Sequence, residues 1–239
     1  TPSVVADTRG FYANRCVMRY VGEGLKMLGE GVKPALIENA AKMAGMPVGP
    51  LSLQDEVALD LGVKLIKQTQ ADLGDKYQPS GTEPILFKMV EDYDRLGRKN
   101  GKGFYDYPSE KGQPKRLWPE LEQFAPGGQY AAEQPTADEV KDRILYTQAL
   151  EAARCMEEEI VADPREADVG SILGWGFAPY TGGTLSFIDT VGAKAFVKRA
   201  EELEAKYGDQ FKVPALLKEM AEKGETFYGR FGTKEAAAA

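Results

Sequence analysis

The sequence of 239 residues contains no histidine. Histidine is the side chain that most often moves protons near neutral pH, so its absence excludes Ser–His–Asp and Cys–His nucleophilic sites and His-ligated zinc. The two cysteines, Cys16 and Cys155, are too few and too far apart for a disulfide framework or a metal cluster. Both lie in helical patterns among apolar neighbours. We therefore expect buried free thiols, a reducing cytoplasmic (bacterial) location and no metal site.

The sequence also lacks features that would indicate phosphate binding, a membrane span or a nucleic-acid partner. No Gly-x-Gly-x-x-Gly segment follows a strand pattern, and no Gly-x-x-x-x-Gly-Lys-Ser/Thr loop is present, so the sequence contains no recognisable phosphate cradle. No apolar run approaches the roughly 18 residues that a membrane span needs, so we expect no such span. The formal net charge of −7 argues against a nucleic-acid partner, because phosphate binding requires a basic face.

One pattern occurs twice, over about 7–60 and again over about 136–192. Arg15 aligns with Arg143 at an offset of 128 residues, and Glu23 then falls on Glu151. Further on, 49–55 matches 183–189 at an offset of 134, so the second copy carries about six extra residues between these anchors. Two copies predict a pair of related helical units rather than a solenoid.

The spacing of apolar residues predicts a mostly helical chain. Apolar steps of three and four residues, with Pro and Gly at the ends, predict helices over about 11–28, 34–43, a third ending near 74, one from 84 onward, 137–161, 192–207 and 213–223. The third helix is expected to carry Leu53, Val57, Leu61 and Leu65 on one face. Thr136 and Glu139 form a capping box.

The repeat and the helix pattern also predict the domain organisation. We expect an all-α fold of two related helical repeats, with a first unit at 1–107, a linker rich in Pro, Gly and Gln at 108–135, and a second unit at 136–232. Residues 1–9 form a short extended segment that has no strand to pair with in a helical protein.

Asn14 is the main candidate for a functional polar side chain. Its carboxamide can cap the following helix or donate to a substrate oxygen, and the residues alone favour capping. At Arg15 and Arg143 a structural ion pair is the better interpretation than anion binding. The turn at 97–103 is more typical of a charged surface turn than of a phosphate grip, and Trp175 and Phe177 are expected to pack in the core.

The ordered motifs resemble the C-terminal helical region of 3-hydroxyacyl-CoA dehydrogenase, in the multifunctional fatty acid β-oxidation protein of the alpha-subunit type. These motifs are Asp7-Thr8-Arg9-Gly10-Phe11-Tyr12-Ala13-Asn14-Arg15, Pro47-Val48-Gly49-Pro50 with Asp55, Lys99-Asn100-Gly101-Lys102-Gly103-Phe104-Tyr105, and Gly174-Trp175-Gly176-Phe177 with Gly182-Gly183. The resemblance covers nearly the whole chain and implies a fold like the C-terminal domain of 6-phosphogluconate dehydrogenase.

The resemblance also implies a function. In this family NAD lies on an N-terminal Rossmann domain that carries a catalytic His–Glu pair, and the protein oxidises 3-hydroxyacyl-CoA to 3-ketoacyl-CoA. That domain, and an enoyl-CoA hydratase region, would precede Thr1. This chain alone would then be inactive and bind no NAD. Asn14 matches the family's active-site asparagine, which gives it a catalytic and substrate-binding role. Leu173 stands where two-repeat relatives often place a substrate-contacting tyrosine.

A second hypothesis remains open. Removing the Rossmann domain would expose apolar surface, and the chain would then be a non-catalytic helical assembly module that binds a thiolase or another subunit.

Overall fold

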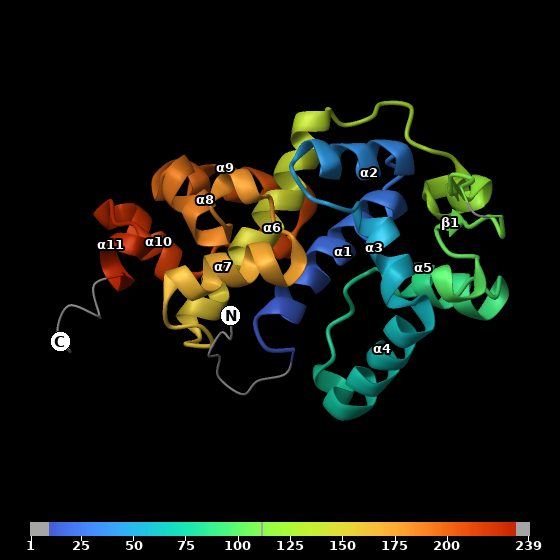
Figure 1. The fold of residues 1–239 in the computed structure, drawn as a ribbon. Coiled ribbons are helices and arrows are strands. Elements are labelled where there is room, and N and C mark those ends of the chain that lie inside the picture. Colours follow the sequence, from blue (N-terminus) through green and yellow to red (C-terminus); the bar gives the residue numbers. More distant parts are fainter. Residues whose placement is uncertain (1–9, 111, 233–239) are drawn as a thin grey trace. The chain divides into compact units, whose positions relative to one another are not determined.

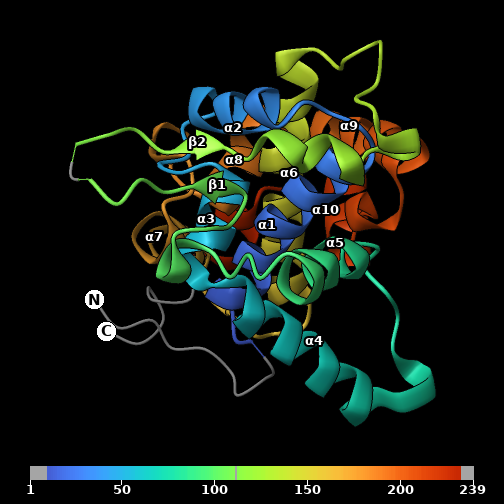
Figure 2. The ribbon, with the colours of Figure 1, turned by 90° about the vertical axis from the view of Figure 1, so that its right-hand side faces the viewer.

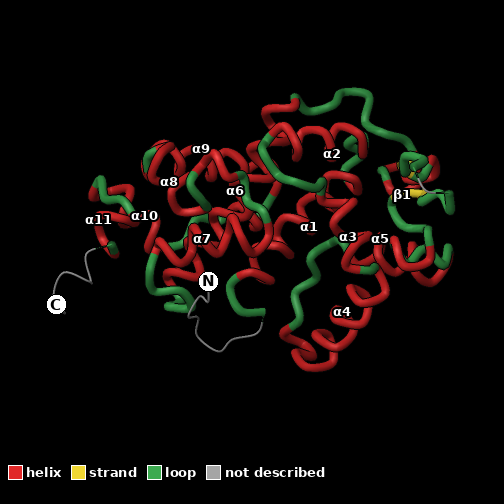
Figure 3. Tube along the Cα trace, viewed as in Figure 1, coloured by secondary structure: helices red, strands yellow, loops and turns green. Residues whose placement is uncertain are grey.

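The computed structural model describes residues 10–110 and 112–232, which are mostly helical (Figure 3). The helices are α1 (Ala13–Gly29), α2 (Pro34–Met43), α3 (Pro50–Val57), α4 (Leu59–Leu73), α5 (Glu83–Phe87), α6 (Ala137–Glu157), α7 (Pro164–Trp175), α8 (Thr184–Val191), α9 (Ala193–Tyr207), α10 (Ala215–Lys223) and α11 (Phe227–Phe231). A π-helical turn continues α5, and strands β1 (Tyr105–Asp106) and β2 (Arg116–Leu117) pair antiparallel. The predicted all-α class is confirmed. The predicted extended segment 1–9 lies outside the described residues.

The chain divides into two compact units. Residues 10–20, 43–47 and 141–232 form unit 1, and residues 21–42 and 48–140 form unit 2. Unit 1 contains α7 to α11 (Figure 1). Its buried apolar side chains form one cluster, in which Tyr146 stacks on Phe196 at 4.2 Å between ring centroids. Unit 2 contains α2 to α5 and the β1–β2 pair (Figure 2). The division into 1–107, 108–135 and 136–232 stays a prediction.

Two helix starts follow the chemistry expected from the sequence. The Thr136 side chain accepts the Glu139 N–H at 3.2 Å, which is half of the predicted capping box at the start of α6. The Asp163 side chain accepts the Arg165 N–H at 2.8 Å at the start of α7, where Pro164 occupies the first turn. In both places a side-chain oxygen satisfies an N–H that has no partner within the helix.

The helical repeat is visible in the backbone where α1 and α6 end. Val32 N–H donates to Met27 O at 2.9 Å, and Ile160 N–H donates to Cys155 O at 2.8 Å. Both pairs are related by the offset of 128 residues. The residue before each donor has a positive φ, 89° in the first copy and 57° in the second. The chain therefore leaves both helices by the same turn.

The repeat continues through the following helices. Helices α2 and α7 begin 130 residues apart, and the pair α3–α4 corresponds to α8–α9 at an offset of 134. Two of the six extra residues therefore lie before α7, two make α7 longer than α2, and two lie in the turn after α7. One residue separates the two helices of each pair: Ala58, with φ 77° and ψ 127°, and Gly192, with φ 88° and ψ 126°.

This junction corrects the prediction of a single third helix ending near residue 74. The left-handed φ at Ala58 interrupts the helix, which periodicity alone does not reveal because the apolar spacing continues across the break. The expected single face, with Leu53, Val57, Leu61 and Leu65, is interrupted by the same break. Val57, Leu61 and Leu65 are 46%, 45% and 49% exposed, whereas Leu59 and Val63 are buried.

A buried carboxylate from the second helix of each copy binds the N-terminus of the third. Glu38 Oε1 accepts the Leu51 N–H at 2.8 Å, and Asp168 Oδ1 accepts the Leu185 N–H at 2.7 Å. A Cβ built on the glycine that precedes each helix would lie only 2.4 Å from the Glu38 carboxylate and 2.5 Å from the Asp168 carboxylate. The predicted match between 49–55 and 183–189 therefore reflects a helix cap that both copies share.

A second carboxylate in each copy of the repeat accepts backbone N–H groups from a later segment of the chain. Asp55 accepts the Tyr105 N–H at 2.9 Å, and Asp189 accepts the Tyr228 N–H at 3.2 Å. The hydroxyls of these two tyrosines donate to the capping carboxylates, at 2.7 Å in the first copy and 2.9 Å in the second. The same hydrogen-bonded frame thus occurs twice, although β1 closes it in the first copy and α11 closes it in the second.

Candidate active-site face

Asn14 lies within the first turn of α1, one residue after the helix begins. Tyr12 O accepts the first helical hydrogen bond, from Cys16 N–H at 3.2 Å, so Asn14 is past the capping position. The capping interpretation favoured by the residues alone is therefore wrong. The Asn14 side chain is exposed, and its carboxamide has no hydrogen-bond partner among residues 10–110 and 112–232.

Two large apolar side chains lie near Asn14 in the chain. Met18 lies four residues after it, one turn further along the same face of α1. Phe11 lies three residues before it, in the turn that precedes the helix, with a φ of 48°. Phe11 is 49% exposed and Met18 is 52% exposed. A polar carboxamide thus lies in the chain between two exposed apolar groups, an arrangement that can contact a ligand with a polar centre and an apolar chain.

Leu173 is another exposed apolar side chain of unit 1. Leu173 is on the last turn of α7 and is 73% exposed. Its neighbour Gly174 lies near the start of α1, because a Cβ built there would be 4.0 Å from the Ala13 Cβ. Val169, one turn earlier on α7, is 46% exposed. We call Phe11, Asn14, Met18, Val169 and Leu173 the Asn14 face; all five belong to unit 1.

Arg15 points into an ion-pair cluster. Its guanidinium lies 2.6 Å from Glu151, which also pairs with Arg19 at 2.9 Å and Arg154 at 2.8 Å, and Arg15 further pairs with Glu158. Burial raises the pKa of Glu151, but the three guanidiniums outweigh it and hold that pKa below its ordinary value. The carboxylate therefore stays ionised, which argues against proton transfer and agrees with the predicted structural ion pair.

The glycine-rich turn at 97–103 also has a structural explanation. Arg98 pairs with Glu56 at 2.8 Å and Lys99 pairs with Asp60, so these cations are already matched within unit 2. The predicted surface turn is the better description. Trp175 and Phe177 pack as expected: Phe177 is fully buried, and Trp175 Nε1 donates to the Gln148 side chain at 2.9 Å.

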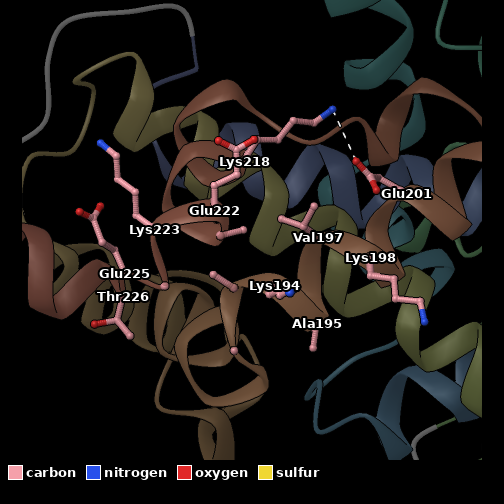
Figure 4. A pocket seen from close by; sticks show the side chains of 14 residues that line it. Lys194, Ala195, Val197, Lys198, Glu201, Lys218, Glu222, Lys223, Glu225 and Thr226 are labelled. Carbon is pink, nitrogen blue, oxygen red and sulfur yellow. Dashed lines mark ion pairs between the residues drawn. The ribbon is translucent and has the colours of Figure 1, made fainter.

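An open groove lies elsewhere in unit 1, between α9 and α10 (Figure 4). Its rim carries Lys218 and Glu201, which pair at 3.6 Å, and apolar side chains such as Val197 line its floor. Neither Asn14 nor Leu173 lines this groove. It is therefore separate from the Asn14 face.

The described part of the chain contains no candidate metal site and no candidate membrane span. Within it, no group of three His, Cys, Asp or Glu side chains is placed to hold a metal ion, and no helix is long and apolar enough to cross a membrane.

Comparison with known proteins shows which family this chain is similar to. Residues 10–107 match the family model described as 3-hydroxyacyl-CoA dehydrogenase, C-terminal domain. This region is therefore similar to that C-terminal domain. The resemblance inferred from the motifs is confirmed.

Curated relatives extend the similarity to nearly the whole chain. The fatty acid oxidation complex subunit alpha of Shewanella amazonensis is 40% identical over 228 residues, and that of Shewanella halifaxensis is 39% identical over 228 residues. Both alignments cover 95% of this chain but only 31% of the relative. The chain thus spans about a third of the length of these relatives.

Solved structures support the dehydrogenase C-terminal fold. The 3-hydroxybutyryl-CoA dehydrogenase of Escherichia coli K12 matches with a TM-score of 0.70 and 18% identity, covering 94% of this chain and 62% of the other. The dehydrogenase part of multifunctional enzyme 1 from C. elegans matches with a TM-score of 0.66 and 24% identity, covering 90% and 48%. At these identities the match establishes the fold.

The resemblance pointed to Asn14 and Leu173, whose roles stay predictions, and the sequence did not single out Phe11 or Met18. For Met18 a signal was available, as an apolar residue one helical turn after a polar one. That pattern is more typical of a buried stripe, and only the fold shows that this side of α1 is exposed.

Proposed function

We propose that this chain is the C-terminal substrate-cleft and packing region of a longer NAD-dependent 3-hydroxyacyl-CoA dehydrogenase of fatty acid β-oxidation. The intact protein would oxidise 3-hydroxyacyl-CoA to 3-ketoacyl-CoA. The observation that carries the proposal is the exposed Asn14 carboxamide, without a partner in the described chain, on an apolar face of a domain that matches this family. The proposal includes a cytoplasmic location and an enoyl-CoA hydratase region in the longer protein.

The chemistry assigned to this face is binding and orientation. The Asn14 NH₂ group would donate to an oxygen of the substrate, which positions that oxygen and stabilises charge developing on it. Leu173, Phe11 and Met18 would contact the acyl part, since apolar surface removed from water favours binding. Both predicted site residues thus keep their proposed roles.

NAD would supply the hydride chemistry in the intact enzyme. The residues of this chain do not fit that cofactor, because the described helices and the single two-stranded sheet contain no strand followed by a glycine-rich loop and a helix. The proposal therefore assigns NAD to a Rossmann domain of the longer protein, outside this sequence.

The test is the activity of the longer protein with Asn14→Ala. We expect kcat for NADH-dependent reduction of acetoacetyl-CoA to fall by about 10²–10³-fold, the typical loss when one preorganised donor is removed. Thermal stability should stay nearly unchanged, because Asn14 is exposed and makes no contact that folding requires. This chain alone should give no turnover.

A matched control is available in α2. Asn39 is also an exposed helical asparagine, so Asn39→Ala makes the same chemical change away from the proposed site. The control should retain full activity. Equal activity of Asn14→Ala and Asn39→Ala would refute the proposed role of the Asn14 face.

An assembly role with a thiolase is a second candidate. Its support is the exposed apolar row Leu61 and Leu65 on α4 in unit 2, together with relatives whose name describes one subunit of a complex. Leu61→Lys combined with Leu65→Lys should then abolish co-purification with a thiolase while dehydrogenase activity persists. Undiminished co-purification would exclude this row as the contact.

A further inference from the structure

Tyr12 anchors the turn of α1 that presents Asn14. Its side chain is 4% exposed, and its ring packs edge-on against Trp175 with 5.4 Å between centroids. The Tyr12 hydroxyl donates to the Ala167 carbonyl at 3.1 Å and lies 2.9 Å from Thr184 Oγ1. Two residues before Asn14, the chain is therefore held by both α7 and α8.

The direction of these hydrogen bonds follows from the chemistry of the groups. A tyrosine hydroxyl has one proton, and a carbonyl oxygen can only accept. Tyr12 therefore donates to Ala167 O, and Thr184 donates its own hydroxyl proton to Tyr12 Oη. Burial raises the pKa of Tyr12 well above its ordinary value, so the hydroxyl stays protonated and the arrangement persists across the working pH range.

The anchor rests on a rigid part of the fold. Thr184 is the first residue of α8 and is fully buried, and its N–H donates to Ser171 Oγ at 3.3 Å. The next N–H along α8, of Leu185, donates to Asp168 at 2.7 Å. The helix that receives the Tyr12 hydroxyl is thus itself fixed by buried hydrogen bonds.

We propose that Tyr12 is a positioning residue for Asn14, fixing the first turn of α1 against α7 and α8 through its buried hydroxyl. This inference rests on the proposed function of the Asn14 face. The Asn14 carboxamide has no protein partner of its own in the described chain, so its orientation depends on the backbone that carries it. A donor must be held within a fraction of an ångström to act on a reacting group.

The main variant is Tyr12→Phe in the longer protein, which keeps the ring and removes the hydroxyl. We expect kcat to fall about tenfold, since small misplacements of this kind have large rate effects, while KM changes less than about twofold. Tyr146→Phe is the matched control: Tyr146 is also buried in unit 1, but its ring packs against Phe187 and Phe196. The control should retain its activity.

A double-mutant cycle separates positioning from general destabilisation. If Tyr12 acts through Asn14, Tyr12→Phe should have no further effect on kcat in an Asn14→Ala background. A purely structural role would lower activity by the same factor in both backgrounds, and that result would overturn the inference. If Asn14→Ala alone has no effect, it is the proposed function that fails.

Two further measurements keep the inference testable if Tyr12→Phe folds poorly. Thr184→Val leaves the Tyr12 bond to Ala167 intact and should give a smaller fall in kcat of the same kind. In this chain, hydrogen exchange of the Cys16 amide, which bonds to Tyr12 O, should accelerate in either variant. Unchanged exchange and unchanged kcat in Thr184→Val would contradict the anchor.

Discussion

The two helix junctions of the repeat give a direct test of backbone strain. Ala58 and Gly192 have nearly the same backbone conformation, with φ of 77° and 88° and ψ of 127° and 126°. A non-glycine residue in such a sparsely populated region costs on the order of 1–3 kcal/mol. The protein places glycine at one junction and alanine at the other, so only the first copy is strained there.

We predict that Ala58→Gly stabilises the protein and that Gly192→Ala destabilises it. Glycine loses about 0.5–1 kcal/mol more conformational entropy on folding, so the net gain at Ala58 should be about 1 kcal/mol. The reverse change should cost about the same. A Cβ at Gly192 would meet no atom within 4 Å, so that cost isolates the backbone conformation from steric clash.

The assay is chemical and thermal unfolding of the purified chain. A change of about 1 kcal/mol should move Tm by about 2–4 °C in a protein of this size. Ala71→Gly is the control, because Ala71 is exposed near the end of α4 and the same substitution there should destabilise by up to about 1 kcal/mol. If Ala58→Gly lowers stability as Ala71→Gly does, the strain argument is wrong.

Two further predictions concern buried polar groups. Thr147→Val should raise the free energy of unfolding by about 1 kcal/mol, because Thr147 Oγ1 is buried without a partner in the described chain; a loss measured by urea unfolding would show that the hydroxyl is bonded. Burial raises the pKa of Asp55 to about 6, although the N–H groups of Phe104 and Tyr105 and the Tyr107 hydroxyl oppose the shift. Since the folded protein holds this proton more tightly than the unfolded chain, the contribution to stability is fully present below about pH 4 and is lost as pH rises through 6. Asp55→Asn should therefore flatten the pH dependence of unfolding between pH 4 and 7, and an unchanged slope would refute the assignment.

The repeat illustrates how much of the fold the sequence predicts. The matched glycines, prolines and acidic residues located both copies and most helix starts, because turn and cap chemistry acts between neighbours in the chain. The break at Ala58 escaped prediction because alanine gives no local signal for a left-handed conformation. It is imposed from outside the helix pair, where Leu59 N–H donates to Leu96 O at 3.1 Å.

The candidate site was likewise predicted only in part from the sequence. The motif around Asn14 resembles a known family, and that resemblance alone pointed to Asn14 and Leu173. Ala13 and Gly174, the chain neighbours of Asn14 and Leu173, lie near each other although they are about 160 residues apart in the sequence. No periodicity in the sequence encodes such a contact.

By itself, the sequence determined the helical class, the twofold repeat, the lack of histidine chemistry and the resemblance to a known family. Each of these depends on residue type and on spacing along the chain. Only the tertiary structure decided which apolar residues are exposed, that Asn14 lies past the capping position of α1, and that Tyr12 anchors the turn that carries Asn14. These depend on which side of each helix finds a partner, and burial is a property of the packed chain rather than of any segment within it.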